Sequence, residues 1–155
     1  MKRNISIACI QYSATENEKY TLEIIKGLIY KAIDAKAEII ALPECATSLQ
    51  KNSILTKELA KTEEQSFSLK TLKDIAKLNS IFILIGSLPI KVGDKLVNRS
   101  FLIGPKGNVL YKYDKIHLYN VNLPNGDIFR ESDTYQDGNK AIIAKIKKNK
   151  IKIGM

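Results

Sequence analysis

Residues 38–45 read Glu-Ile-Ile-Ala-Leu-Pro-Glu-Cys: a short apolar run that is ended by Pro43 and followed directly by a carboxylate. The run Glu38–Leu42 is typical of a strand buried inside an α/β layer. Before it, apolar residues at helical spacing predict a helix over Glu18–Ala35, and the mostly apolar segment Asn4–Gln11 predicts a first strand. A strand, a helix and a strand in this order predict a βαβ crossover, hence parallel or mixed pairing.

The rest of the chain extends this layer. The further expected elements are a helix over Gln65–Asn79, a buried strand over Ile81–Gly86, a hairpin of Leu96–Ile103 with Asn108–Tyr113, and a last hairpin of Ala141–Ile146 with Lys150–Ile153. Gly104-Pro105-Lys106-Gly107 is a strong turn signal for the first hairpin, and Lys148-Asn149 would form the turn of the last. The sequence therefore predicts an α/β fold: a mixed sheet with two principal helices, and hairpins that extend the sheet.

Composition excludes several classes of protein. The chain has 155 residues, of which 45% are hydrophobic, and its formal charge is 25 − 16 = +9. Only three of the basic residues are arginines, which are the preferred readers of phosphates and bases, so we expect no nucleic-acid partner. No segment approaches the ~18 apolar residues of a membrane span, so we expect no membrane partner either. A basic α/β binding or partner module without catalysis stays open as the alternative, and its affinity for an anionic partner would fall steeply with salt.

The two cysteines and the single histidine do not have the spacing of a metal site. We therefore expect no metal ion. The cysteines are isolated and the sequence shows no signal-peptide pattern, so we expect the protein to reside in a reducing cytoplasm. Cys9 lies in the middle of the first predicted strand and is expected to be a small core residue.

Glu44 is the first candidate for chemistry. In open α/β sheets functional groups gather at the carboxyl ends of strands, and Glu44 directly follows Pro43 at such an end. A carboxylate held there, partly buried and with a raised pKa, could act as a general base. A helix-capping or surface glutamate would occupy the same position in the sequence.

Lys115 and Glu131 are the second and third candidates. Lys115 follows the strand Asn108–Tyr113, and an inward ammonium there could stabilise a developing oxyanion. It could equally pair with its neighbour Asp114. Glu131 lies in the long polar stretch Leu118–Asn139, which we expect to be a functional or mobile loop. It could hold Lys115 in place, or form a loop salt bridge with Arg130 or a lysine.

Neither Cys45 nor His117 is expected to be catalytic. Neighbouring strand residues point to opposite sides, so Cys45 should diverge from Glu44. His117 has no cysteine or serine partner at a plausible turn.

Several motifs in order resemble the nitrilase superfamily of carbon–nitrogen hydrolases. They are Cys9-Ile10-Gln11, Leu42-Pro43-Glu44-Cys45, Asn98-Arg99-Ser100, Tyr113-Asp114-Lys115-Ile116-His117-Leu118, Phe129-Arg130-Glu131-Ser132-Asp133 and Gly138. The segment Lys115–Gly138 is most similar to the amidase branch that contains omega-amidases and deaminated-glutathione amidases. Each motif is weak alone, but the ordered set covers essentially the whole chain.

The resemblance implies an αββα sandwich and hydrolysis of a small carboxamide by a Glu–Lys–Cys triad without a cofactor. Glu44 matches the general base, Lys115 the oxyanion-stabilising lysine and Glu131 the supporting glutamate. The nucleophilic cysteine of the family follows an elbow of the type Gly-x-x-x-Cys, and no residue of this sequence matches it, since Gly154 is followed only by Met155. Residues 1–155 are therefore expected to be the N-terminal portion of such a domain, cut before the nucleophile elbow and inactive alone, with a second copy or a C-terminal half as partner.

Overall fold

A five-stranded mixed sheet forms the centre of the computed structural model, which describes residues 4–146 and 151–155. Its strands lie in the order β1 (Ile7–Cys9), β2 (Ile39–Ala41), β3 (Phe82–Val92), β4 (Lys95–Ile103) and β5 (Val109–Asp114). The first three are parallel, and β4 and β5 continue the sheet in antiparallel pairing. The predicted βαβ crossover and mixed sheet are thus confirmed.

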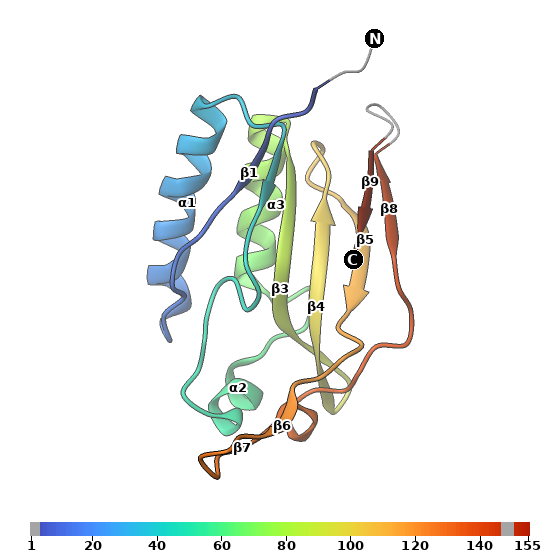
Figure 1. Ribbon diagram of the computed structural model, residues 1–155. Helices are drawn as coiled ribbons and strands as arrows, with labels where there is room; N and C mark the ends of the chain where they lie inside the picture. Colours follow the sequence, from blue (N-terminus) through green and yellow to red (C-terminus); the bar gives the residue numbers. More distant parts are fainter. Residues whose placement is uncertain (1–3, 147–150) are drawn as a thin grey trace.

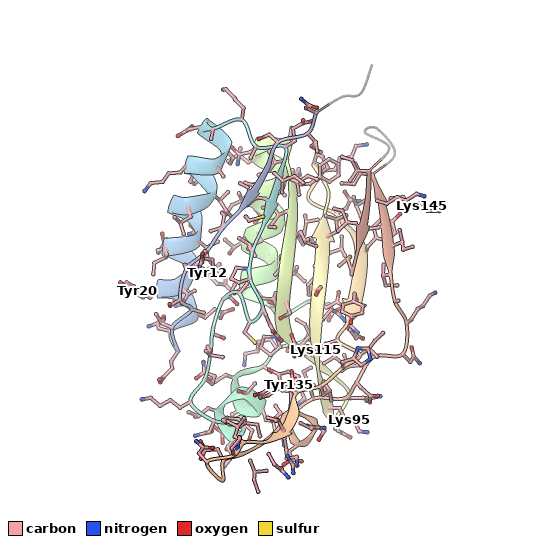
Figure 2. The ribbon with its side chains drawn as sticks, in the orientation of Figure 1. Tyr12, Tyr20, Lys95, Lys115, Tyr135 and Lys145 are labelled. Carbon is pink, nitrogen blue, oxygen red and sulfur yellow. The ribbon has the colours of Figure 1, made fainter. Side chains whose placement is uncertain are left out.

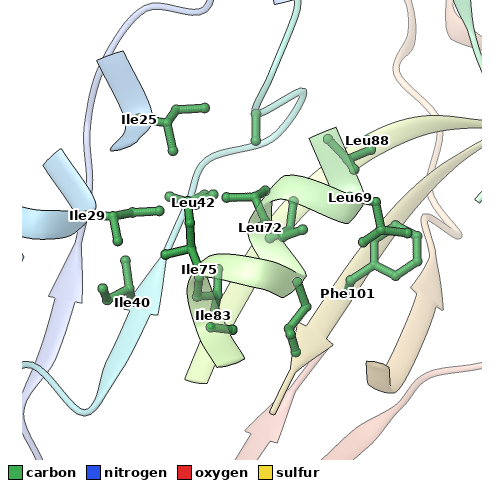
Figure 3. Packing of buried hydrophobic residues seen from close by; sticks show 14 of the residues in the cluster. Ile25, Ile29, Ile40, Leu42, Leu69, Leu72, Ile75, Ile83, Leu88 and Phe101 are labelled. Carbon is green, nitrogen blue, oxygen red and sulfur yellow. The ribbon is translucent and has the colours of Figure 1, made fainter. Parts of the chain in front are cut away.

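Two helices cover one face of this sheet, α1 (Glu18–Asp34) and α3 (Phe67–Asn79) (Figure 1). Each begins where a polar side chain satisfies a free N–H of the first turn: Asn17 accepts from the Tyr20 N–H and Ser66 from the Leu69 N–H. Each helix buries one apolar stripe against the sheet, and the stripes form the main core that Figure 3 shows. Its largest fully buried members include Ile25, Ile29, Leu72, Ile83, Ile85 and Phe101.

A third helix, α2 (Ser53–Leu59), was not predicted. It starts at Asn52, whose side chain accepts from the Leu55 N–H, and none of its residues is buried. A helix without a buried stripe leaves no hydrophobic periodicity in the sequence, which is why the pattern missed it.

The last hairpin does not extend the central sheet, which corrects our prediction. Strands β8 (Ile143–Ile146) and β9 (Ile151–Gly154) form a separate two-stranded sheet. Ala144 and Ile146 are buried in a second cluster with Ile39 and Leu102, so the hairpin packs on the central sheet in a layer of its own. Figure 1 shows it on the side away from α1 and α3. The predicted turn Lys148-Asn149 lies outside the described residues.

The first strand is shorter and less covered than predicted. Because β1 pairs only with β2 and stands at the edge of the described sheet, Ile7 is 52% exposed and Cys9 is also exposed. The expectation that Cys9 is a core residue is therefore wrong. No helix in the described ranges is long and apolar enough to cross a bilayer.

The polar stretch Leu118–Asn139 contains a β-ribbon instead of only a loop. Strands β6 (Asn120–Asn122) and β7 (Ile128–Arg130) pair antiparallel, and the 3₁₀ helix η1 (Glu131–Asp133) follows. The connecting turn is stabilised by Asn125, whose Oδ1 accepts from the Asp127 N–H. This ribbon lies at the end of the sheet where β2 and β5 finish (Figure 1).

Candidate active site

A tight backbone contact places Glu44. A Cβ at Gly86 would lie 2.4 Å from the carbonyl carbon and oxygen of Pro43, so the chain can leave β2 at this angle only beside a glycine. The register of β3 and β4 shifts between Ile85 and Leu88, and the shifted backbone binds the turn: Ser87 Oγ accepts from the Cys45 N–H at 2.9 Å, and Ser87 O accepts from the Ala46 N–H at 2.9 Å. The Glu44 side chain therefore emerges from a fixed turn.

Two backbone hydrogen bonds fix the position of Lys115. Its N–H donates to Asn98 O at 3.0 Å, and its carbonyl accepts from the Gly138 N–H at 2.9 Å. A Cβ at Gly138 would lie 2.2 Å from Asp114 O, so a larger residue would displace this strand end. Figure 2 shows Lys115 at the end of the sheet nearest the β6–β7 ribbon.

Glu131 is the first residue of η1 and forms two hydrogen bonds with Tyr119, one as acceptor and one as donor. The Tyr119 N–H donates to Glu131 Oε2 at 2.6 Å, and the Glu131 N–H donates to Tyr119 O at 3.1 Å. The β6–β7 ribbon, which lies between Tyr119 and Glu131 in the sequence, thus places Glu131 beside Lys115.

The three predicted residues meet in one cluster. Lys115 Nζ lies 2.9 Å from Glu44 Oε1, 2.9 Å from Glu131 Oε2 and 3.1 Å from Glu131 Oε1. Two of the alternative pairings are absent: Asp114 forms its ion pair with Arg99 instead of Lys115, and Arg130 donates to Val121 O, Phe129 O and Asn122 Oδ1 instead of Glu131. The Glu44 side chain is 57% exposed, because it projects into an open cleft.

The electrostatics of the cluster favour its ionised form. Partial burial alone would lower the pKa of Lys115, but the hydrogen bonds that it donates to Glu131 and Glu44, and the charges of these carboxylates, raise it overall. Burial alone would raise the pKa of Glu131, but the Tyr119 N–H, Lys115 and Asn98 together hold it below its usual range. At neutral pH Lys115 is therefore an ammonium and Glu131 a carboxylate.

Asn98, a residue to which the sequence reasoning gave no role, belongs to the same cluster. It lies on β4, is 2% exposed, and its Nδ2 donates to Glu44 Oε1 at 2.8 Å and to Glu131 Oε1 at 3.3 Å. The only signal in the sequence was its place in the Asn98-Arg99-Ser100 motif.

A cleft of about 720 Å³ opens above the cluster. Glu44, Lys115 and Glu131 lie in its wall, together with Cys45 and Arg130, and Tyr12, Leu49, Tyr119 and Phe129 give it apolar surface. The rings of Tyr119 and Phe129 pack at 5.9 Å between centroids. His117 is exposed and does not line the cleft. A space of this size accommodates a small organic molecule.

Cys45 lies in the same wall as Glu44, so the expectation that the two diverge is wrong. Residues 44–47 form a turn rather than a strand, and Cys45 adopts a left-handed φ of 47°. Burial, then the charges of Glu44 and Glu131, raise the pKa of the Cys45 thiol to about 11. A thiol with such a pKa is protonated at neutral pH, which makes it a poor nucleophile.

Comparison with known proteins identifies the family. The family model described as carbon-nitrogen hydrolase matches residues 6–155, and the chain therefore belongs to the carbon–nitrogen hydrolase family. It is 33% identical over 141 residues to nitrilase homolog 2 of Dictyostelium discoideum, covering 90% of this chain and 42% of that protein. It is 32% identical over 132 residues to omega-amidase NIT2 of Bos taurus, covering 85% and 47%. The chain thus spans about half the length of the curated relatives it matches.

Solved structures show the same fold. The NitFhit protein of C. elegans superimposes with a TM-score of 0.79 at 23% identity, over 88% of this chain and 34% of that one. A glutamine-for-glutamate mutant of an amidase from Nesterenkonia sp. AN1, with the acetamide moiety of fluoroacetamide on its active-site cysteine, gives 0.78 at 18% identity. That match covers 97% of this chain and 54% of the amidase. The nitrilase-type fold expected from the motifs is thereby confirmed.

Proposed function

We propose that residues 1–155 are the N-terminal portion of an enzyme that hydrolyses a small carboxamide to an acid and ammonia. The observation that carries the proposal is the contact of one ammonium, Lys115, with two carboxylates, Glu44 and Glu131, in the wall of an open cleft. The family supports amide chemistry, and the relatives named omega-amidases support omega-amides as substrates.

Glu44 is the general base in this proposal. Its Oε1 accepts from Lys115 and Asn98, whereas its Oε2 accepts no hydrogen bond from the residues that the structure describes. That free oxygen can take the proton of a thiol, whose sulfur then attacks the carboxamide carbon. Glu44 returns the proton to the leaving ammonia, and a thioester remains. It then activates the water that releases the acid.

Lys115 stabilises the oxyanion of the tetrahedral intermediates. An ammonium has three donors, and Lys115 directs them to Glu44 Oε1 and to both oxygens of Glu131. In this proposal a substrate oxygen takes over the donor of the longest of these contacts, the one of 3.1 Å to Glu131 Oε1. Glu131, whose side chain is 15% exposed, keeps Lys115 charged and in place. Lys115 would act electrostatically, and a charged group that is already held in position stabilises a developing oxyanion most effectively.

The nucleophile in this proposal is a thiol outside residues 1–155. Cys9 is exposed on β1 and does not line the cleft, and the Cys45 thiol is protonated at neutral pH. Because both cysteines are free, we place the protein in a reducing compartment such as the cytoplasm. A matching thiol would come from further polypeptide that packs beside the cleft, either from the same protein or from a partner. Ile7 on β1 and Ile143 on β8, which are 52% and 60% exposed, are apolar surface that such a segment or a second copy would cover.

The test is ammonia release from small carboxamides, omega-amides included, by the intact protein that contains this chain. Lys115→Met should lower kcat/KM about 10²- to 10³-fold, the usual cost of an oxyanion donor. Lys112→Met is the matched control and should retain activity, because Lys112 lies on β5 just before Lys115 but pairs with Glu63 away from the cleft. Residues 1–155 alone should release no measurable ammonia, since loss of a covalent nucleophile costs on the order of 10⁶ in kcat. Equal activity of the two lysine variants, or turnover by residues 1–155 alone, would contradict the proposal.

A further inference from the structure

Asn98 contacts all three residues of the candidate site. Its side-chain amide donates to Glu44 and to Glu131, and its backbone carbonyl accepts from the Lys115 N–H. The residue lies on β4, which pairs with β3 on one side and β5 on the other, and is 2% exposed, so packing fixes it more firmly than the carboxylates it contacts.

The orientation of this amide is fixed by charge. If the group were turned over, Oδ1 would face two carboxylate oxygens and repel both, so Nδ2 must face them. In this orientation Oδ1 is buried and has no hydrogen-bond partner among the described residues. An unmade buried hydrogen bond destabilises a protein, whereas a leucine at the same position would leave no unpaired oxygen. The unpaired Oδ1 of Asn98 therefore lowers stability, and the two hydrogen bonds that Nδ2 donates to Glu44 and Glu131 offset this loss.

We propose that Asn98 is a positioning residue that holds the Glu44 carboxylate against the Lys115 ammonium and at a fixed separation from Glu131. The link to catalysis rests on the proposed function, whereas the contacts of Asn98 are independent of it.

The two carboxylates depend on Asn98 to different degrees. Glu131 is also held by the Tyr119 N–H at 2.6 Å and by two contacts with Lys115. Glu44 is 57% exposed, and among the described residues it has Lys115 as its one hydrogen-bond donor besides Asn98. Without the amide, Glu44 is free to rotate into the cleft while Glu131 keeps Lys115. A variant of Asn98 should therefore impair the base in the chemical step and leave substrate binding nearly intact.

Two variants of the intact protein test this role. Asn98→Leu removes the donor, and we expect kcat to fall about 10- to 100-fold with little change in KM, the usual worth of a hydrogen bond to a charged group. Asn98→Asp keeps the shape but adds a carboxyl group between Glu44 and Glu131. Because that group can donate only when protonated, the activity of Asn98→Asp relative to the native protein should rise as pH falls, while that of Asn98→Leu stays constant.

Asn79→Leu is the matched control. Asn79 ends α3, and its amide donates to Ile75 O at 2.9 Å, so the same substitution removes one amide hydrogen bond outside the cleft. A merely structural role of Asn98 would make the two leucine variants equal in kcat once their stabilities are matched, and that result would overturn the proposal. Should Asn98→Leu fail to fold, the pH dependence of Asn98→Asp tests the proposal instead. A relative activity that does not rise as pH falls would overturn it.

A second readout is independent of activity. Carbon-13 NMR of the Glu131 carboxyl should show a higher pKa in Asn98→Leu than in the native protein, because one donor to the carboxylate is lost, and no change in Asn79→Leu. If the intact protein hydrolyses no amide, the proposed function fails, but this titration still tests Asn98. An unchanged Glu131 titration in Asn98→Leu would show that the amide does not position the carboxylates.

Discussion

The backbone of Pro43 passes so close to Gly86 that a Cβ on the glycine would lie 2.4 Å from the Pro43 carbonyl. The contact joins β2 to β3 at the point where the chain turns to present Glu44. We therefore expect Gly86→Ala to destabilise the protein by about 1–3 kcal/mol, the usual cost of forcing extra atoms into a packed site, and to displace Glu44. Urea unfolding measures the first effect and amide hydrolysis by the intact protein the second.

Gly27 provides the control for this substitution. It lies inside α1, and a Cβ there would have no atom within 4 Å. Gly27→Ala should raise the free energy of unfolding by about 0.5–1 kcal/mol because alanine favours the helix. Similar effects of the two substitutions would show that the Pro43–Gly86 contact is not tight.

The sequence predicted the elements that bury an apolar face and missed those that do not. The helices α1 and α3 and the strands of the βαβ unit follow from hydrophobic spacing, but α2 has no buried residue and left no such signal. Glu44, Lys115 and Glu131 could be named as candidates because each lies in a local motif. A role for Asn98 could not be predicted, since its contacts with Glu44 and Glu131 span 54 and 33 residues and depend on the packing of β4.

Cys45 should react slowly with alkylating reagents although it lies in the cleft wall. The raised pKa of its thiol, about 11, means that the reactive thiolate forms only in strongly alkaline solution. At pH 8 iodoacetamide should modify Cys45 far more slowly than an ordinary thiol, and peptide mass spectrometry measures the rate. In Glu44→Gln the rate should increase, because the negative charge that opposes ionisation is lost. Rapid modification of native Cys45 would mean that it is a thiolate, and Cys45 would return as a candidate nucleophile.

The contribution of Glu131 to stability should depend on pH with a definite sign. Its pKa is lower in the folded chain than the ordinary glutamate value of about 4.3, so the folded state binds this proton less readily than the unfolded state. The stabilisation is therefore complete above that value and is lost as pH falls through the lower, folded pKa. In urea unfolding, the native protein should exceed Glu131→Gln in stability at pH 7, and the difference should disappear in strong acid.

Glu58→Gln controls for the loss of a charge. Glu58 lies exposed on α2, and its substitution should change stability by less than about 0.5 kcal/mol. A Glu131→Gln difference that persisted unchanged into strong acid would contradict the assigned contacts.

Arg99 supports the strand end that carries Lys115. Its guanidinium binds Asp114 through two hydrogen bonds of 2.6 and 2.7 Å and Glu63 through a third of 2.6 Å, with 16% of the side chain exposed. Arg99→Met would leave two carboxylates without their shared partner and should cost about 3 kcal/mol, the lower end for a buried pair because Asp114 is partly exposed. Arg99→Lys keeps the charge but not the bidentate geometry and should recover part of the loss. If the two variants were equal in stability, the geometry of the guanidinium would not matter.

The dependence of amide hydrolysis on Glu44 tests the central claim most directly. The measurement is kcat/KM for ammonia release by the intact protein, by Glu44→Gln, and by Glu64→Gln as a control of the same residue type away from the cleft. The account predicts that Glu44→Gln lowers kcat/KM to background, because Glu131, the other carboxylate in the cleft wall, is already bound by Lys115, Asn98 and the Tyr119 N–H. Glu64→Gln should leave kcat/KM unchanged. Native activity in Glu44→Gln would contradict the account.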